Sequence, residues 1–355
     1  MTGRAVASAL WILLAGPAAF AQKVQIGVLG LFHPREITLS AAGREAIVVT
    51  AGDKVFVLEP GARAGVARIQ ASNDGLLLEF GGQSLRAGEI FAAGRDTRSA
   101  SLLLRVAGKV SRKYQGTLDV KAIGGEVVPI VTMDLETAVA SVVAAESAGD
   151  TPLEALKAQA VVTRSYLVAG KGRHSNFDFC DLTHCQFLRE PPSSESPAGV
   201  AAVLTRGLVI TSEEKPIAAM FTRSCAGHTR TPAELGISIN SYPYYSVECE
   251  ACYKSPKRWT CRISAPEAVR LAGKGEAGRL AVNRRLGWST VRSNNFTVKR
   301  EDREVVLQGT GEGHGIGLCQ HGAKAMAEGD ANFREIIGHY FPNTALNIIS
   351  TASGF

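Results

Sequence analysis

The sequence changes from a strand pattern to a helix pattern near residue 134, and this change limits the folds open to the chain. Residues 22–132 contain short runs of Val, Ile and Leu separated by Gly, Asn and Pro, as is typical of strands and turns. Gly124-Gly125 lies between two such runs and predicts a β-hairpin. Apolar residues then recur at helical spacing from Leu135 onwards. We therefore predict an α+β protein, in which a β-rich amino-terminal region precedes a mixed α/β region.

The first predicted helix ends its apolar stripe with a carboxylate. Leu135, Val139, Val142 and Val143 follow helical spacing, and Glu146 returns to within about 20° of Leu135 around the helix axis. Burial disfavours the ionised form of a carboxyl, so a buried Glu146 would have a raised pKa and could act as a general acid near neutral pH. The alternative is a glutamate at the helix end that faces solvent.

A second predicted helix carries two cations on a face that should be buried. Residues 151–154 (Thr-Pro-Leu-Glu) supply a capping residue, a proline for the first helical position and a glutamate three residues after the cap. Lys157 and Arg164 share a face with the apolar residues Leu153, Leu156, Ala160 and Leu167. A buried cation needs a partner, so this helix could meet Glu146 or an anionic or hydroxyl-rich ligand. In the alternative, Lys157 extends to water and Arg164 forms a structural ion pair.

Every cysteine lies in the carboxyl-terminal half of the chain. They are Cys180, Cys185, Cys225, Cys249, Cys252, Cys261 and Cys319. His174, Cys180, His184 and Cys185 offer nitrogen and sulfur ligands that suit tetrahedral zinc, although a Cys180–Cys185 disulfide is the alternative in an oxidising compartment. The Cys-x2-Cys-x8-Cys pattern at residues 249–261 is a second candidate metal site, again with a disulfide as the alternative.

Two polar, glycine-rich segments, residues 221–229 and 309–322, do not have the composition of a core. Glycine at alternate positions allows the backbone to approach a ligand closely. A nucleotide-binding loop is excluded, because no crossover unit with an acidic residue about 20 positions further on follows the glycines. Cys319 is a candidate nucleophile, and the alternative is a disulfide with Cys225 as its partner.

The first 21 residues have the pattern of an export signal. Arg4 precedes an apolar stretch, Ala5–Ala15, and Ala19-Phe20-Ala21 is a cleavage site of the small-x-small type. Because a membrane span needs about 20 apolar residues, we expect a protein that is exported to the periplasm or beyond, cleaved after Ala21 and not stably inserted in a membrane. The alternative is an uncleaved anchor. The formal charge of +6 is spread along the chain without a basic run, so no nucleic-acid partner is expected.

Six segments resemble, in order, the motifs of the stage II sporulation protein D family, also called the SpoIID/LytB domain. They are VVAAES (142–147), PLEALKAQA to RSY (152–166), CDLTHCQ (180–186), TRGLVI (205–210), S-x3-HT (224–229) and GHGIGLCQHGA (313–323). Six motifs in one order are far more specific than any single motif. The resemblance implies a catalytic domain at residues 116–350, after a β-rich region at residues 22–115.

The resemblance implies a peptidoglycan lytic transglycosylase, which cleaves between N-acetylmuramic acid and N-acetylglucosamine without adding water and prefers glycan strands stripped of stem peptides. Glu146 matches the catalytic glutamate, and we identify no second acid beside it. The family motifs also suggest the substrate-binding candidates Lys157, Arg164, Ser224, His228, His314 and Gln320. His174, Cys180, His184 and Cys185 match a zinc-binding segment in which the metal is structural, and no organic cofactor is implied.

Two departures and two rival hypotheses accompany this resemblance. Cys225 and Cys319 stand where relatives often have small residues, so a disulfide across the cleft would give this protein a different pocket. Some relatives are described as amidase enhancers, which suggests a non-catalytic module that binds the cell wall and activates an amidase. A carboxyl on a buried face argues against a pure binder. A zinc hydrolase centred on residues 174–185 is the third hypothesis, and the absence of an H-E-x-x-H motif argues against it.

Overall fold

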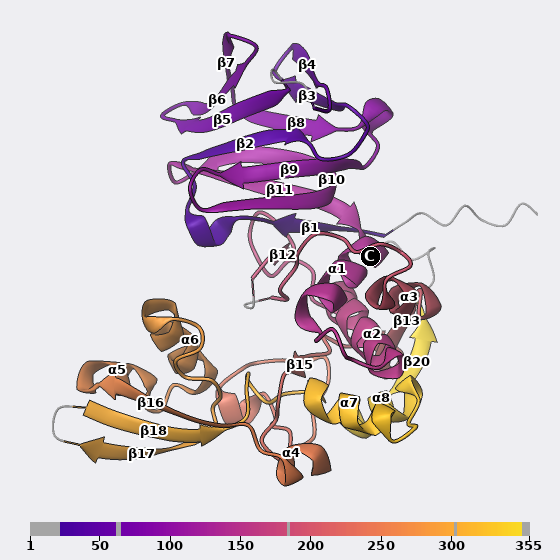
Figure 1. Cartoon of the computed structure of the whole chain (residues 1–355), viewed down its shortest axis with the longest axis vertical. Helices are drawn as coiled ribbons and strands as arrows, with labels where there is room; N and C mark the ends of the chain where they lie inside the picture. The colour runs from indigo at the N-terminus through magenta and orange to yellow at the C-terminus, as the bar shows by residue number, and fades with distance from the viewer. Residues whose placement is uncertain (1–21, 62–64, 183–184, 302–303, 350–355) are drawn as a thin grey trace, which may run out of the picture.

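The structure is a computed structural model that describes residues 22–61, 65–182, 185–301 and 304–349. The predicted export signal and the candidate ligand His184 lie outside the described residues. The β-rich region comes first and the helices follow it, so the predicted α+β class is confirmed. Figure 1 shows the β-rich region at one end of the molecule, with the helices and a smaller sheet at the other end.

The β-rich region is one sheet that curls around its own core. The main path of this sheet runs β12-β1-β11-β10-β9-β2-β5-β6-β7, and β8, β3 and β4 branch from β10. Its elements are β1 (Lys23–Gly27), η1 (Gly30–Phe32), β2 (Glu36–Ala41), β3 (Ile47–Ala51), β4 (Lys54–Leu58), β5 (Val66–Ser72), β6 (Gly75–Phe80), β7 (Gln83–Ala87), β8 (Glu89–Ala93), η2 (Arg95–Thr97), β9 (Ala100–Val106), β10 (Val110–Ile123) and β11 (Glu126–Asp134).

Strand β10 is the branch point of this sheet. Its first half pairs with β9, and its second half pairs with both β8 and β11. Gly116 lies where the pairing changes, and a Cβ at this position would be 2.4 Å from the Thr132 carbonyl oxygen. Gly124 and Gly125 adopt φ angles of 61° and 79° between β10 and β11, so the predicted hairpin is confirmed. The predicted domain division at residue 116 falls inside β10 and stays a prediction.

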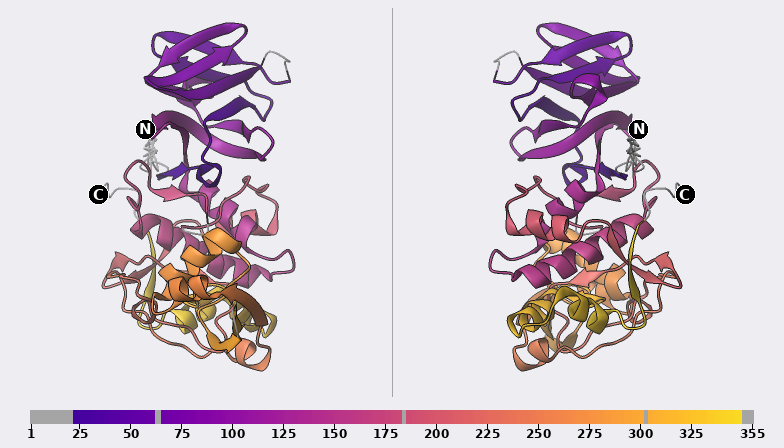
Figure 2. Two further views of the ribbon diagram at one scale, coloured as in Figure 1. Left: turned by 90° about the vertical axis from the view of Figure 1, so that its left-hand side faces the viewer. Right: turned by 90° about the vertical axis from the view of Figure 1, so that its right-hand side faces the viewer.

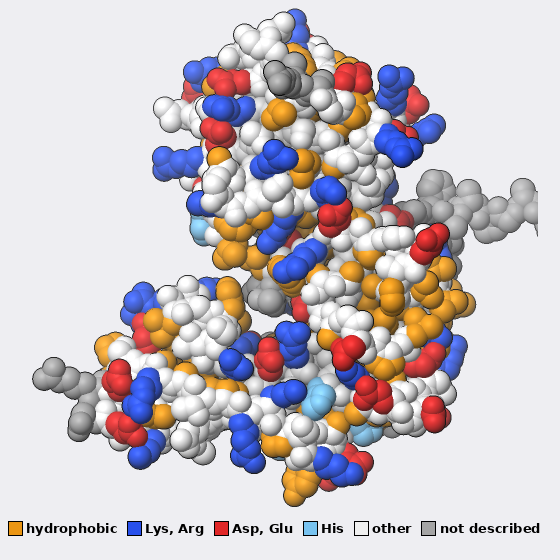
Figure 3. Space-filling model, in the orientation of Figure 1, with side chains coloured by type: hydrophobic (Ala, Val, Ile, Leu, Met, Phe, Trp, Pro, Cys, Tyr) orange, Lys and Arg blue, Asp and Glu red, His pale blue; other side chains and the backbone are white. Residues whose placement is uncertain are grey.

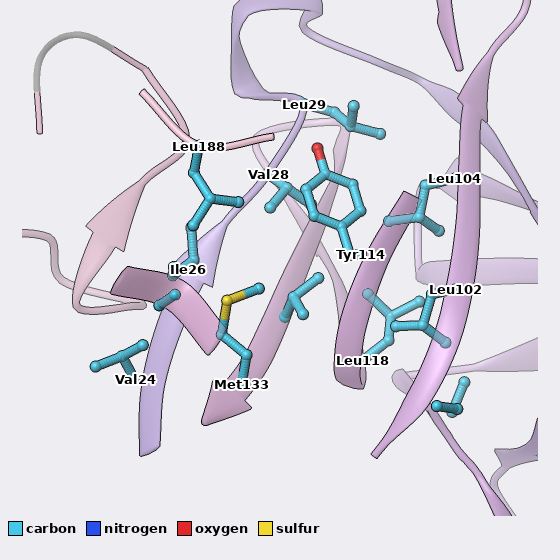
Figure 4. Packing of buried hydrophobic residues seen from close by; sticks show 14 of the residues in the cluster. Val24, Ile26, Val28, Leu29, Leu102, Leu104, Tyr114, Leu118, Met133 and Leu188 are labelled. Carbon is cyan, nitrogen blue, oxygen red and sulfur yellow. The ribbon is translucent and has the colours of Figure 1, made fainter. Parts of the chain in front are cut away.

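Buried apolar residues from alternate strand positions form a core that continues into the helices. Ile26, Met133 and Leu188 are each at most 2% exposed and belong to this core cluster (Figure 4). Leu188 comes from the segment after β12 (Phe179–Cys180), which pairs in parallel with β1. The segment that follows β12 is therefore attached to the β-rich region.

The first helix, α1 (Leu135–Glu146), begins directly where β11 ends. The Asp134 side chain caps it by accepting hydrogen bonds from the backbone N–H groups of Glu136 and Thr137. The second helix, α2 (Leu153–Ala169), starts one residue later than predicted, because Pro152 takes the cap position. Apart from its ends, α2 is buried almost all round, whereas the sequence predicted a single buried face.

The remaining elements complete two further cores. They are α3 (Pro197–Leu204), β13 (Leu208–Ser212), β14 (Lys215–Pro216), β15 (Phe221–Thr222), η3 (Ala233–Leu235), α4 (Glu250–Lys254), β16 (Arg258–Ser264), α5 (Ala265–Leu271), α6 (Gly275–Leu286), β17 (Phe296–Glu301), β18 (Glu304–Thr310), β19 (Leu318–Cys319), α7 (Gln320–Glu328), α8 (Phe333–Tyr340) and β20 (Ala345–Ile348). One core lies between α2, β19 and α8. The other belongs to a small module of β16, β17 and β18 with α5 and α6.

This small module projects from the rest of the chain. Figure 2 shows it from two further sides, and Figure 3 shows the surface hollowed between the module and the helical region, with acidic and basic side chains gathered there. Among the described helices, none has both the length and the apolar character needed to cross a bilayer.

Candidate active site

Glu146 lies at the meeting point of two adjoining cavities. As the last residue of α1, it continues the face on which Val139, Val142 and Val143 are buried, and it is itself half-buried. The cavities have volumes of about 350 and 510 Å³, and Glu146 lines both of them. The apolar stripe of α1 thus brings a carboxyl to the floor of an open cleft.

The surroundings of Glu146 favour its protonated form. The Phe187 backbone N–H donates a hydrogen bond of 2.9 Å to Oε1. Burial raises the pKa of the Glu146 carboxyl, while the Phe187 N–H and the cations Arg223 and Arg189 act in the opposite direction. Burial is the largest of these effects, so the pKa is raised overall. A carboxyl in this state holds its proton at a higher pH than a solvated glutamate and can deliver it to a leaving group.

Three of the predicted substrate-binding residues line the cleft. The Gln320 side chain donates to the Glu146 carbonyl oxygen at 3.2 Å and lines both cavities. Ser224 is 2% exposed and lines the first cavity. His314 lines the second cavity, where its Nδ1 accepts the Ile316 N–H at 3.0 Å. Burial lowers the pKa of His314 to about 4, so its ring is neutral near neutral pH.

The other three predicted substrate-binding residues lie elsewhere. Arg164 is fully buried, and its guanidinium contacts Glu136 at 2.6 and 2.8 Å and the Leu208 carbonyl oxygen at 3.1 Å. Lys157 pairs with Glu154 at 2.6 Å, and His228 is exposed and outside both cavity linings. The cationic face of α2 therefore meets acids of the protein, which for Arg164 is the structural ion pair given as the alternative, and the roles of these residues at the substrate stay predictions.

The cleft contains charged residues that the sequence did not single out. Arg223 and Glu312 line both cavities, and their side chains are 3.5 Å apart. Glu312 is a second acid that lines the cavities of Glu146, whereas the sequence had indicated none. Both residues lie inside the glycine-rich segments, so the segments indicated the site although the individual residues went unnoticed. Glu276 and Arg279 of α6 line the second cavity, so the small module forms one of its walls.

A candidate metal site adjoins this cleft. The ligand atoms of His174, Cys180 and Cys185 lie within 4.8 Å of one another, and pairing of β12 with β1 fixes the position of Cys180. One imidazole nitrogen and two sulfurs fit the donor set that zinc prefers, so these residues could hold such an ion. Cys185 also lines the second cavity, two residues before the Phe187 N–H that contacts Glu146. A metal here would position the loop that contacts the carboxyl.

Comparisons with known proteins relate part of this chain to one family. Residues 124–212 match the family described as "SpoIID: Stage II sporulation protein". The predicted resemblance to this family is therefore confirmed, by the match of residues 124–212 and by relatives named stage II sporulation protein D.

Individual relatives extend the similarity beyond the family match. An uncharacterized protein of Brachyspira hyodysenteriae is 28% identical over 264 residues, which cover 64% of this chain and 71% of that protein. Stage II sporulation protein D of Bacillus amyloliquefaciens is 28% identical over 258 residues, covering 60% of this chain and 74% of that protein. An amidase enhancer of Bacillus subtilis is 39% identical over 61 residues, or 17% of this chain and 9% of that protein.

Proposed function

We propose that this protein is an exported peptidoglycan lytic transglycosylase with Glu146 as its general acid and base. The observation that carries the proposal is a half-buried carboxyl of raised pKa where two adjoining cavities meet. The family resemblance supports the same substrate. Two adjoining cavities that share one acid suit a long glycan, because the sugars before and after the scissile bond each need a place to bind.

In the proposed reaction, Glu146 acts twice. Its protonated carboxyl donates to the glycosidic oxygen between N-acetylmuramic acid and N-acetylglucosamine, and the bond from that oxygen to the muramic C1 breaks. The resulting carboxylate then takes the proton of the muramic C6 hydroxyl as that oxygen bonds to C1. The products are a free 4-hydroxyl on N-acetylglucosamine and a 1,6-anhydro end, and the acid is regenerated without water.

The rest of the cleft suits a peptide-stripped strand. Removal of the stem peptide leaves a free carboxylate on the lactyl group of muramic acid, and a cation is its natural partner. Arg223 and Arg292 line the second cavity, and Lys257 lines the first. Trp288, also in the second cavity, offers an apolar surface for the face of a sugar ring. We propose that these cations favour stripped strands over intact peptidoglycan.

The metal group has a structural role in this proposal. Zinc bound by His174, Cys180 and Cys185 would join three parts of one segment through bonds that supply folding energy. The segment then presents the Phe187 N–H to Glu146. No step of the proposed reaction passes through the metal.

Mass spectrometry of the products tests the proposal. The mature protein is incubated with peptide-free glycan strands and, separately, with intact peptidoglycan. We expect anhydro-muramic ends from the wild type and none from Glu146→Gln. Glu190→Gln is the matched control, because Glu190 is an exposed acid three residues after Phe187. Ends that carry an added water would indicate a hydrolase instead.

A second candidate function is a wall-binding module that enhances an amidase. The match to the Bacillus subtilis amidase enhancer favours it. This candidate predicts no cleavage of either substrate by folded protein, but retention of the protein on peptidoglycan and faster release of stem peptides when an amidase is added. Cleavage that depends on Glu146 would exclude it as the sole activity.

A further inference from the structure

Four cysteines that are far apart in the sequence meet in the core beside the cleft. Cys225 follows β15, Cys249 and Cys252 belong to the α4 turn, and Cys319 ends β19. Their exposed fractions are 4%, 3%, 0% and 0%, respectively. The four Sγ atoms all lie within 4.8 Å of one another. This tetracysteine group shares no residue with the group of His174, Cys180 and Cys185.

The spacing of the four sulfurs matches a single tetrahedral ion. Zinc bound by four thiolates has Zn–S bonds of about 2.3 Å, which separates the sulfurs by about 3.8 Å. Cys252 and Cys319 lie 3.5 Å apart, and the 4.8 Å limit holds for every pair. Two disulfides would require only two close pairs. Mutual closeness of all four sulfurs is the geometry that one shared ion imposes.

Polar groups around the tetracysteine group are placed to donate to thiolates. The Tyr340 hydroxyl lies 3.4 Å from the Cys249 sulfur, and the Gly322 backbone N–H donates to the Cys319 sulfur at 3.4 Å. The Ser224 hydroxyl and His321 Nδ1 lie 3.3 and 3.5 Å from the sulfur of Cys252. Four thiolates with one divalent ion carry a net negative charge, and such hydrogen bonds stabilise that charge in a buried site.

The backbone also fits closely around the sulfurs. A Cβ at position 322 would lie 2.5 Å from the Cys249 sulfur and even closer to the Tyr340 hydroxyl oxygen. Only glycine therefore allows the first turn of α7 to approach the group, and this turn carries the N–H that reaches Cys319. The close approach is explained if the turn has to form part of a compact ligand shell.

We propose that Cys225, Cys249, Cys252 and Cys319 bind one structural zinc ion. The ion joins the segment after β15, the α4 turn and the start of α7. Ser224 and Gln320 are each the sequence neighbour of a ligand and line the cleft. The tetracysteine site thus fixes a wall of the cleft, and it does so separately from the group of His174, Cys180 and Cys185. Cys261, which the sequence grouped with Cys249 and Cys252, lies on β16 against the core of the small module and is not a ligand.

Elemental analysis and thiol mapping of the purified full chain test this proposal. We expect Cys252→Ala to contain one zinc ion fewer than the wild type, and Cys261→Ser, the matched control, to contain the same number as the wild type. The double variant Cys180→Ser with Cys185→Ser should keep the zinc ion of the tetracysteine group, which distinguishes this group from that of His174, Cys180 and Cys185. Circular dichroism checks that each variant is folded.

A second measurement does not depend on altering the tetracysteine group. Zinc X-ray absorption of the Cys180→Ser, Cys185→Ser protein should show four sulfur neighbours at about 2.3 Å. Two disulfides among the four cysteines in non-reduced peptide maps would overturn the proposal. Four thiols that react freely in metal-free, folded protein, or iron in place of zinc, would also overturn it. None of these outcomes depends on glycan cleavage, so the proposed enzyme activity stands or falls separately.

Discussion

The backbone N–H of Phe187 donates a 2.9 Å hydrogen bond to Oε1 of Glu146. The two residues come from different parts of the fold, because Glu146 ends α1 and Phe187 lies in the loop after β12. That loop is attached at both of its ends to the β-rich region, through the buried Asp181 and the buried Leu188. We therefore expect the β-rich region to influence the position and the proton affinity of the candidate catalytic carboxyl.

The raised pKa of Glu146 predicts how stability depends on pH. The folded state holds the proton above the usual pKa of 4.5, where the unfolded chain has lost it. The contribution of the protonated Glu146 carboxyl to the free energy of unfolding is fully present below pH 4.5. It is lost as the pH rises through the folded-state pKa of Glu146. Glu146→Gln cannot titrate, so wild type should lose stability relative to the variant over that range. Urea unfolding of both proteins from about pH 4 to about pH 8 measures this difference in the free energy of unfolding. A difference that stays constant with pH would contradict the expectation.

The same proton predicts the pH dependence of cleavage. A general acid must be protonated, so kcat/KM of the wild type should fall as the pH rises through the raised pKa of Glu146. Replacement by glutamine should lower cleavage by about 10²- to 10⁴-fold at pH values below that pKa, where the wild-type acid is protonated. A pH–rate profile on peptide-free strands checks both statements. A wild-type rate that rises steadily with pH would argue against an acid role for Glu146.

Glu312 distinguishes a transglycosylase from a two-carboxylate hydrolase. The proposed reaction uses only Glu146, so Glu312→Gln should keep the anhydro product and lose no more than about 10-fold in rate through its contact with Arg223. A hydrolase that used Glu312 as a base or nucleophile would lose about 10²-fold or more. Single-turnover assays with product identification measure the difference, and Glu248→Gln, outside both cavity linings, is the control.

The two cations of α2 should affect stability and leave substrate binding unchanged. Arg164→Ala leaves Glu136 without its buried partner and should destabilise the fold by about 3–5 kcal/mol. Lys157→Ala breaks a partly exposed pair with Glu154 and should cost about 1 kcal/mol or less. Chemical unfolding measures both effects. The KM of both variants should stay at the wild-type value. A raised KM for Lys157→Ala would support its predicted role at the substrate.

The sequence predicted local features well where they depend on neighbouring residues. The Gly124-Gly125 hairpin and the stripe that leads to Glu146 follow from spacing alone. The partner of Arg164 could not be predicted in this way, because Glu136 lies 28 positions earlier and on another helix. Helical periodicity indicates that a cation is buried, but it does not indicate which acid meets it.

Long-range contacts also explain why the cysteines group differently in the fold than the sequence predicted. The sequence placed Cys249 with Cys261, because they are close along the chain. The fold separates them, since β16 carries Cys261 into the small module, and it brings Cys225 and Cys319 to Cys249 instead. Parallel pairing of β15 with β19 makes that contact, and such pairing between distant strands leaves no local signal. Glu312 was not predicted for a similar reason, because only the folded chain brings it to the two cavities that Glu146 lines.

The attachment of the loop to the β-rich region gives the last prediction. Asp181 is fully buried and accepts hydrogen bonds from the Leu29 N–H, the Tyr114 hydroxyl and Arg112. Asp181→Asn leaves the Arg112 charge without its partner, so we expect a loss of about 3 kcal/mol in the free energy of unfolding.

The same variant should change the proton affinity of Glu146. A displaced loop weakens the Phe187 hydrogen bond, which favours the ionised carboxyl, so the pKa of Glu146 should rise further. The alkaline limb of the pH–rate profile would then move to higher pH, a change that simple loss of folded protein does not produce. Asp178→Asn is the matched control, because among the described hydrogen bonds the Asp178 carboxylate accepts only from the backbone N–H groups of Gln25 and Gly172. A profile that keeps its wild-type position in folded Asp181→Asn would show that the β-rich region supports the fold without setting the acid.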